Sequence, residues 1–234
     1  MRAGRKIEVI IPALNEERAI AKVVQDIPAF VDQIIVGDNG SLDQTVQTAR
    51  DAGATVIVEE ERGYGAACLK ALTLSDPDAI IVFLDGDYSD YPQEMASLVD
   101  PIIAGEAKMV IGSRVTGKAQ SGSLTPPQVF GNTLACWLIK LIWGMKFSDL
   151  GPFRAIDGKA LSELDMQDRN YGWTVEMQIK AAHAKLPSLE VPVSYRNRIG
   201  ISKVSGTIKG SVLAGTKILG LIARYSLAPP RTKK

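Results

Sequence analysis

The sequence predicts an α/β protein with one central, mostly parallel sheet that is flanked by helices. Short apolar segments typical of buried strands alternate along the first half of the chain with segments typical of helices. Strands and helices that alternate at this spacing form parallel sheets through right-handed crossovers. A chain of 234 residues has the length of one large domain and can bury a substantial core.

The first half contains four strand-like segments and three helix-like segments. Ile7 to Ile11 is apolar at four of its five positions and stops at Pro12, as a buried strand does. Asp43 suits the N-cap or first turn of one helix, and Gly63 and Gly65 open another. In chain order, we expect strand 7–11, helix 19–26, strand 33–36, helix 43–52, strand 55–58, helix 63–72 and strand 79–84.

The second half has fewer regular segments. A fifth strand is expected over residues 109–111, and a helix begins at Trp173 and includes Gln178. The segment 116–128 contains two glycines and two prolines, so we expect it to be a mobile loop.

Two amphipathic helices are expected in the second half, at 134–145 and 207–225. The first is too short to cross a bilayer, which takes roughly 20 residues, but Trp137 and Trp143 suit a helix that lies in the membrane interface. The second carries three basic residues within roughly 80° of arc on an otherwise apolar helix. The alternative is that both helices form core or an oligomer surface. We favour peripheral membrane binding.

Composition excludes several classes of protein. The net charge is +1, so bulk electrostatics do not predict a nucleic-acid partner. His183 is the only histidine, which argues against histidine metal sites and a Ser-His-Asp triad. The two cysteines lack metal-binding spacing and suit a reducing compartment. No apolar run precedes the first strand, so we expect no signal peptide and a cytoplasmic protein.

The segment Asp85-Gly86-Asp87 is the most informative in the chain. Its two carboxylates follow a buried strand directly, at the sheet edge where open α/β proteins bind ligands. Buried acids need a cation, and a hard divalent metal on a diphosphate is the usual one. The alternative is a simple strand-ending turn, because Asp-Gly pairs are common in turns.

The other loops at this edge carry polar residues that suit a nucleotide diphosphate. Residues 12–16 offer free backbone groups with Asn15 and Glu16, and residues 37–41 offer Asp38 and Gly40. Gly63 and Gly65 allow close backbone approach, and Arg114 follows the fifth strand. The glycine patterns of Rossmann domains and P-loops are absent. Five such loops on one edge predict a nucleotide-diphosphate site.

The chain resembles the family 2 glycosyltransferases of the GT-A fold, and within them the polyprenyl (dolichyl) phosphate hexose synthases. The resemblance covers roughly residues 7–205 and rests on motifs in the family's order. These are Ile11-Pro-Ala-Leu-Asn-Glu-Glu17, Val36-Gly-Asp-Asn-Gly-Ser-Leu-Asp43, Arg62-Gly-Tyr-Gly-Ala66, Asp85-Gly-Asp87, Gly112-Ser-Arg114 and Asp149-Leu-Gly-Pro-Phe-Arg154. It implies a GT-A domain over 1–206, with a nucleotide-sugar half (1–115) and an acceptor half (116–206), followed by a helix and basic tail over 207–234.

The resemblance also implies roles for individual residues. Asp87 would bind Mg²⁺ or Mn²⁺ on the donor diphosphate, Asp85 would contact ribose or metal, and Arg114 would lie near the phosphates or the acceptor. The donor site as a whole would comprise Pro12, Ala13, Asn15, Glu16, Asp38, Gly40, Gly63, Gly65, Asp85 and Gly86. Tyr64 replaces a lysine that is frequent in the family, so one phosphate cation is lost or comes from elsewhere.

The second half is expected to bind the acceptor. Arg154 would clamp an anionic acceptor, and Arg196, Arg198 and Lys203 form a basic cluster able to hold a diphosphate or a lipid phosphate. The alternative for that cluster is a solvated loop. Asp149 is either the candidate base or a helix cap. Glu176 lies among apolar residues of the expected helix. It either belongs to the acceptor side or is a buried structural acid paired with an arginine.

Acceptor chemistry separates the two functions that remain. A lipid phosphate is already anionic and needs cations, whereas a hydroxyl needs a general base, for which Asp149 is the candidate. The surplus of basic residues and the two interfacial helices favour inverting transfer of a hexose from UDP-glucose or GDP-mannose to a polyprenyl phosphate. Such an enzyme would be peripheral on the inner face of the membrane and could form a homo-oligomer. The alternative is transfer to a hydroxyl of a saccharide or other small molecule.

Overall fold

The computed structural model describes residues 1–200 and 208–230. Its strands are β1 (Ile7–Ala13), β2 (Gln33–Asp38), β3 (Thr55–Val58), β4 (Ile80–Phe83), β5 (Met109–Ala119), β6 (Arg154–Asp157) and β7 (Ser188–Tyr195). They form one sheet in the order β3-β2-β1-β4-β6-β5-β7. Neighbouring strands are parallel, except that β6 runs antiparallel to both β4 and β5.

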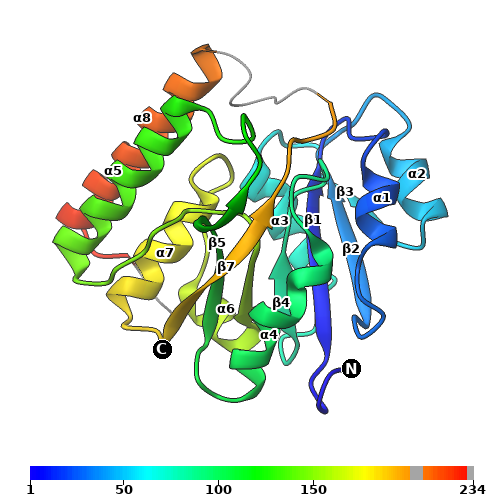
Figure 1. The fold of residues 1–234 in the computed structure, drawn as a ribbon, viewed down its shortest axis with the longest axis horizontal. Coiled ribbons are helices and arrows are strands. Elements are labelled where there is room, and N and C mark those ends of the chain that lie inside the picture. Colours follow the sequence, from blue (N-terminus) through cyan, green and yellow to red (C-terminus); the bar gives the residue numbers. More distant parts are fainter. Residues whose placement is uncertain (201–207, 231–234) are drawn as a thin grey trace.

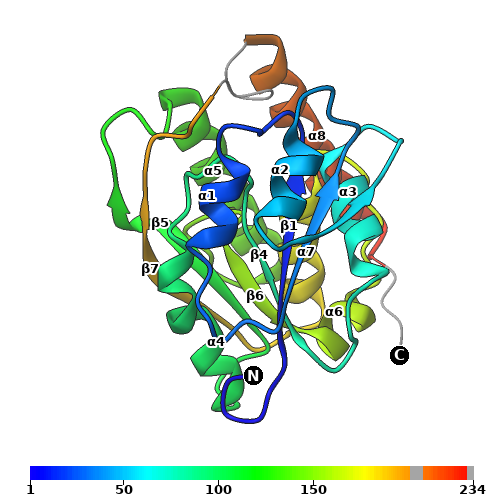
Figure 2. The ribbon, with the colours of Figure 1, turned by 90° about the vertical axis from the view of Figure 1, so that its right-hand side faces the viewer.

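Helices cover both faces of the sheet (Figures 1 and 2). They are α1 (Ile20–Gln25), α2 (Thr45–Asp51), α3 (Tyr64–Leu72), α4 (Met95–Ile103), α5 (Pro126–Trp143), α6 (Gly158–Leu164), α7 (Trp173–His183) and α8 (Ile208–Leu227). In β4, Ile80 and Val82 pack with α1, α2 and α4, whereas Ile81 and Phe83 pack with α3 and α5 to α8. A strand buried on both faces explains the uninterrupted apolar run before Asp85.

The structure confirms the predicted α/β class and the mostly parallel sheet. All seven elements expected in the first half are present, with ends within two residues of the prediction. The sequence pattern does not predict α4, β6, α6 or β7. β5 also crosses the predicted boundary after residue 115, so the two expected halves share one sheet.

The loop expected over 116–128 is shorter in the structure: it spans residues 120–125, and both of its expected ends belong to regular elements. Residues 116–119 belong to β5, which shifts its register against β7 between Ser113 and Lys118. A Cβ at Gly117 would lie 1.9 Å from the carbonyl oxygen of Val193, so this glycine permits the close pairing. α5 begins at Pro126, and Thr125 forms a capping box with Gln128 at this end. The prolines do not interrupt the helix, because proline is well suited to the first turn.

α5 and α8 lie side by side at the surface (Figure 1). Each helix leaves large apolar side chains exposed, including Phe130 (70%), Trp137 (56%), Leu141 (66%) and Leu213 (50%). Trp143 instead packs against the core. The side chain of Lys209 and the basic tail 231–234 lie outside the described part. In residues 1–200 and 208–230, no helix has the length and apolarity that spanning a bilayer requires.

Polar contacts attach α8 to the body of the protein. Lys217 Nζ lies 2.8 Å from Asp168 Oδ2, and the Tyr225 hydroxyl donates to Glu176 Oε1 at 2.8 Å. Glu176 also pairs with Lys180 at 3.0 Å, and both side chains are buried. Glu176 is therefore a buried structural acid, although its partner is a lysine and not the arginine considered above.

Candidate active site

One cavity of about 850 Å³ lies at the carboxyl ends of the parallel strands. The loops after β1, β2 and β4 meet β5 and the segment after β7 around it. Its charged lining residues are Glu16, Arg62, Asp85, Asp87, Arg114, Asp149 and Arg198. Its apolar lining residues include Val115, Leu124, Pro127, Val129, Leu150, Tyr171 and Ile218. The cavity is therefore lined both by charged side chains of the strand ends and loops and by side chains of α5 and α8, among them Val129 and Ile218.

Asp85 directly follows Leu84 at the end of β4. Its Oδ1 accepts a hydrogen bond from the Tyr64 hydroxyl at 3.0 Å, and its backbone N–H donates to Asp90 Oδ2 at 3.2 Å. Burial raises the pKa of Asp85 to about 7, and the charge of Asp87 adds to that rise. Tyr64, at the position of the family's frequent lysine, thus gives Asp85 a neutral partner.

Asp87 uses its two oxygens differently. Oδ1 accepts from the backbone N–H of Ser89 at 2.9 Å and from its hydroxyl, so it is bound within its own loop. Oδ2 lies 3.0 Å from Nη2 of Arg198, which comes from the segment after β7. The side chain is almost wholly buried. The oxygen able to serve a ligand is therefore Oδ2.

Asp90 is a buried acid that the sequence prediction missed. Its Oδ1 has no hydrogen-bond partner among the described residues. Burial raises the pKa of Asp90 well above its usual range, and Asp85 and Asp87 raise it further. The spacing Asp87-x-x-Asp90 was visible in the sequence. Nothing local, however, shows that the turn brings Asp90 back beneath Asp85.

The residues at this end fit a divalent cation. Asp85 and Asp87 offer carboxylate oxygens, which Mg²⁺ and Mn²⁺ accept, and their mutual repulsion shows an excess of negative charge. Asp87 Oδ2 already faces a cation, the Arg198 guanidinium. Within the described residues, no three His, Cys, Asp or Glu side chains form a ready-made metal site. The donor diphosphate would have to supply the remaining ligands.

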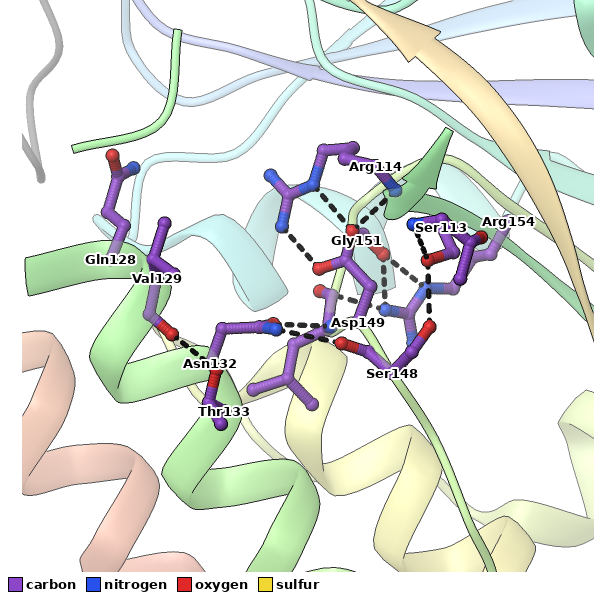
Figure 3. A network of polar contacts seen from close by, with 12 residues as sticks. Ser113, Arg114, Gln128, Val129, Asn132, Thr133, Ser148, Asp149, Gly151 and Arg154 are labelled. Atoms are coloured by element: carbon purple, nitrogen blue, oxygen red, sulfur yellow. Dashed lines mark hydrogen bonds and ion pairs between the residues drawn. The ribbon is translucent and has the colours of Figure 1, made fainter. Parts of the chain in front are cut away.

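Asp149 and Arg114 form a close ion pair at the cavity wall (Figure 3). Asp149 accepts from the backbone N–H of Arg114 at 2.8 Å, from Nε at 2.8 Å and from Nη2 at 2.7 Å. This partner raises the pKa of Arg114 despite its burial. Asp149 caps no helix. Both of its carboxylate oxygens are already bonded to Arg114 in this conformation.

The segment that carries Asp149 is fixed from several elements (Figure 3). Asn132 of α5 donates to the Ser148 carbonyl at 3.0 Å and accepts from the Leu150 N–H at 2.8 Å. Gln178 of α7 donates to the Asp149 carbonyl at 2.9 Å. Asn132 and Gln178 were not among the predicted site residues, because their partners are main-chain groups distant in sequence.

Arg154 lies outside the cavity, contrary to the expectation that it clamps an acceptor. It is fully buried, and its guanidinium donates to the carbonyls of Leu150, Gly151 and Thr174. Burial lowers the pKa of Arg154 to about 10. In this structure Arg154 binds the main chain that directly follows Asp149 and does not face the cavity.

Predicted nucleoside-binding residues divide between the cavity wall and the layer behind it. Pro12, Ala13 and Glu16 line the cavity. Asp38 lies behind the wall, where Oδ2 accepts from the N–H groups of Gly40 and Ser41 and the buried Oδ1 has no partner among described residues. Asn15 bonds to the 41–42 loop, accepting from the Leu42 N–H. Asn15 and Gly40 therefore shape the loops and do not line the cavity.

The two predicted glycines after β3 serve the protein's own backbone. A Cβ at Gly63 would lie 2.0 Å from the Arg169 carbonyl oxygen, and one at Gly65 would lie 1.9 Å from that of Asp168. Gly63 also lines the cavity, but Gly65 does not. The approach predicted at these glycines was that of a ligand, whereas the segment that approaches them in the structure is 168–170 of this chain.

The predicted basic cluster separates in space. Arg198 lines the cavity and pairs with Asp87 and Glu16. Arg196 lies outside the cavity, with its guanidinium 3.3 Å from the Tyr88 ring centroid and 4.3 Å from that of Tyr91. Arg196 therefore holds the Tyr88–Tyr91 turn and is not presented to a phosphate. Lys203 lies outside the described residues.

Comparison with known proteins agrees with this geometry. The family model described as glycosyl transferase family 2 matches residues 8–158. An uncharacterized glycosyltransferase of Mycobacterium tuberculosis is 34% identical over 215 residues, covering 91% of this chain and 95% of its own. A dolichyl-phosphate hexose transferase of Haloferax volcanii is 30% identical over 212 residues, covering 88% and 90%.

Solved structures show the same fold. Glucosyl-3-phosphoglycerate synthase from Mycobacterium tuberculosis, in complex with Mn²⁺, UDP-glucose and phosphoglyceric acid, matches with a TM-score of 0.78 at 24% identity. The match covers 97% of this chain and 82% of that one. At this identity the likeness establishes the fold, and it confirms the predicted GT-A class.

Proposed function

The chain belongs to glycosyltransferase family 2, and we propose that it transfers a hexose from UDP-glucose or GDP-mannose to a polyprenyl phosphate. Two relatives support the substrates. One is the dolichyl-phosphate hexose transferase of Haloferax volcanii, and the other is the structural neighbour that binds Mn²⁺ with UDP-glucose. Asp85 and Asp87 would hold Mg²⁺ or Mn²⁺ with the donor.

The observation that carries the acceptor proposal is the continuity of the cavity. Its lining includes Asp85, Asp87 and Arg198 together with Val129 of α5 and Ile218 of α8. Those helices expose apolar side chains to solvent. A polyprenyl phosphate likewise combines an anionic head with an apolar tail, so one molecule could contact both kinds of lining residue.

The acids in the cavity also favour an acceptor that needs no base. Among the described lining residues, Glu16 pairs with Arg198, Asp149 pairs with Arg114, and Asp85 and Asp87 form the donor end. A general base works best when it is unpaired and within reach of the hydroxyl. A phosphate acceptor is already ionised at neutral pH and requires cations, and Arg62, Arg114 and Arg198 line the same cavity.

The proposed reaction is an in-line displacement at the anomeric carbon. Pro12, Ala13 and Glu16 bind the nucleoside side of the donor, and the lining arginines bring the acceptor phosphate up to the sugar against charge repulsion. A metal on Asp85 and Asp87 would neutralise the diphosphate as it departs. Attack by the phosphate oxygen on the face opposite the diphosphate inverts the anomeric carbon.

We further propose that the enzyme works at the inner face of the membrane as a peripheral protein. The exposed Phe130, Trp137 and Leu141 of α5 and Leu213 of α8 would enter the interfacial region. An apolar surface of this kind also suits a second copy of the chain. Vesicle binding distinguishes the two.

The transfer test uses labelled UDP-glucose and GDP-mannose with a short polyprenyl phosphate, in Mn²⁺, Mg²⁺ or EDTA. We expect metal-dependent label in an acid-labile lipid, lost in Asp87→Ala. Asp78→Ala is the matched control, because Asp78 is an exposed acid paired with Lys159 away from the cavity. Donor binding without lipid product would contradict the acceptor proposal. The hydroxyl-acceptor function would then replace it.

The membrane test measures co-sedimentation with anionic vesicles. Trp137→Glu with Leu141→Glu should reduce vesicle binding strongly and leave donor binding unchanged. Leu74→Glu is the control, because Leu74 is an exposed leucine outside α5 and α8. Unchanged vesicle binding together with a change from oligomer to monomer would show that the α5–α8 surface joins two copies instead.

A further inference from the structure

Arg198 forms ion pairs with two acids that line the cavity, Asp87 and Glu16. Its Nη2 lies 3.0 Å from Asp87 Oδ2 and 3.2 Å from Glu16 Oε1. Its Nε is buried and has no hydrogen-bond partner among the described residues. The guanidinium thus has an N–H group that makes no hydrogen bond to the described residues. That group can donate to an anion bound in the cavity.

A metal ion and Arg198 would compete for the same oxygen. Asp87 Oδ1 is committed to the N–H and hydroxyl of Ser89, which leaves Oδ2 for any cation. Oδ2 is the atom that Arg198 contacts. A divalent ion on Oδ2 would lie close to the guanidinium, and the repulsion between the two positive groups favours displacement of the guanidinium when a metal binds at Asp87.

The main chain keeps Arg198 close after displacement. The N–H of Arg196 donates to the Ser89 carbonyl at 2.9 Å, and the N–H of Ile199 donates to the Asp87 carbonyl at 2.9 Å. These bonds fix the backbone on both sides of Arg198, while its side chain remains 29% exposed. The freed side chain can therefore turn without leaving the acid loop.

We propose that Arg198 is a positioning residue that exchanges Asp87 for the donor diphosphate when the metal binds. Without donor, the arginine neutralises Asp87 and keeps the metal site closed. With donor and metal together, the metal takes Oδ2, and the guanidinium, including its unused Nε, pairs with a diphosphate oxygen. The inference rests on the donor class of the proposed function and does not depend on the acceptor.

This exchange couples metal binding to nucleotide binding. When the metal binds alone, the displaced Arg198 guanidinium loses Asp87 and gains no other anion. When the metal binds with a nucleoside diphosphate, the guanidinium pairs with the diphosphate instead. Each ligand therefore raises the affinity for the other, and the coupling is reciprocal. Loss of Arg198 should tighten binding of Mn²⁺ alone about tenfold and weaken the enhancement by nucleotide about tenfold.

The test is titration of free Mn²⁺ by electron paramagnetic resonance, with and without UDP or GDP, on purified full-length protein. The variants are Arg198→Gln and Arg198→Lys, with Arg62→Gln as the matched control. Arg62 lines the same cavity but donates to the carbonyl of Asn39 and not to a carboxylate. It thus reports the loss of one positive charge without loss of the Asp87 contact.

We expect tighter Mn²⁺ binding and weaker coupling in Arg198→Gln, near wild-type behaviour in Arg198→Lys and a small change in Arg62→Gln. Equal effects in Arg198→Gln and Arg62→Gln would overturn the inference, because general electrostatics would then suffice. Wild-type coupling in Arg198→Gln, or no Mn²⁺ binding by the wild type with either nucleotide, would also overturn it. Failure of lipid transfer alone would reject the acceptor proposal and leave this result unaffected.

Discussion

Replacement of Asp149 by asparagine tests whether this acid acts through Arg114. The change removes the charge that faces Arg114 and leaves one carbonyl oxygen where the carboxylate accepted three hydrogen bonds. Asp149 is 1% exposed and the Arg114 side chain is 13% exposed, so solvent hardly screens the pair. Arg114 would remain charged, because an arginine does not lose its proton at this pH.

The expected cost follows from this geometry. Removal of one partner from a buried ion pair costs about 3–5 kcal/mol. The asparagine carbonyl keeps one contact and Arg114 borders the cavity, so we expect a cost at or just below the bottom of this range, about 2–3 kcal/mol of unfolding free energy. For a chain of this size the melting temperature should fall by about 4–12 °C. Urea unfolding and calorimetry measure both quantities.

A double-mutant cycle with Arg114→Gln completes the test. If the two residues act as a pair, the double variant should lose less stability than the two single variants together, by about 2 kcal/mol. Its transfer rate should equal that of Arg114→Gln alone. A cost for Asp149→Asn below about 0.5 kcal/mol would refute the pairing. A further loss of transfer in the double variant would instead assign Asp149 the role of general base.

Three other predictions follow from the acid cluster and its glycines. Tyr64→Phe removes the hydrogen bond that lowers the pKa of Asp85, so Mn²⁺ binding at pH 7 should weaken several-fold and recover at pH 8.5 in the same titration. In the absence of metal, the difference in unfolding free energy between the wild type and Asp85→Asn should fall as the pH rises from about 4 to about 7. The reason is that Asp85 keeps its proton in the folded protein over this range and loses it in the unfolded chain. A difference that does not change with pH would contradict the raised pKa. Gly65→Ala would place a Cβ against the Asp168 carbonyl and should cost more than about 2 kcal/mol in urea unfolding, whereas Gly220→Ala, in open space on α8, should be neutral or stabilising.

The sequence by itself predicts the class of fold and the position of the donor end. Ile80 to Leu84 can be recognised as a doubly buried strand because every residue in it is apolar. The acids that follow it must lie at the carboxyl edge of the sheet. The loops that contain Glu16 and Asp87 follow strands of the same kind, so parallel pairing brings them together. Local composition was sufficient to predict these strands, because a strand that is buried on both faces must be apolar along its whole length.

Only the tertiary structure decides which charges face the cavity. Arg196 and Arg198 are two residues apart, yet the chain leaves β7 at Tyr195, so one stacks between tyrosines and the other reaches Asp87. Arg154 has the same charge but is used to satisfy buried carbonyls. The partner of a charged side chain depends on segments that approach from elsewhere in the chain. A sequence records the charge, but the folded backbone determines whether that charge meets a ligand, an acid or a carbonyl.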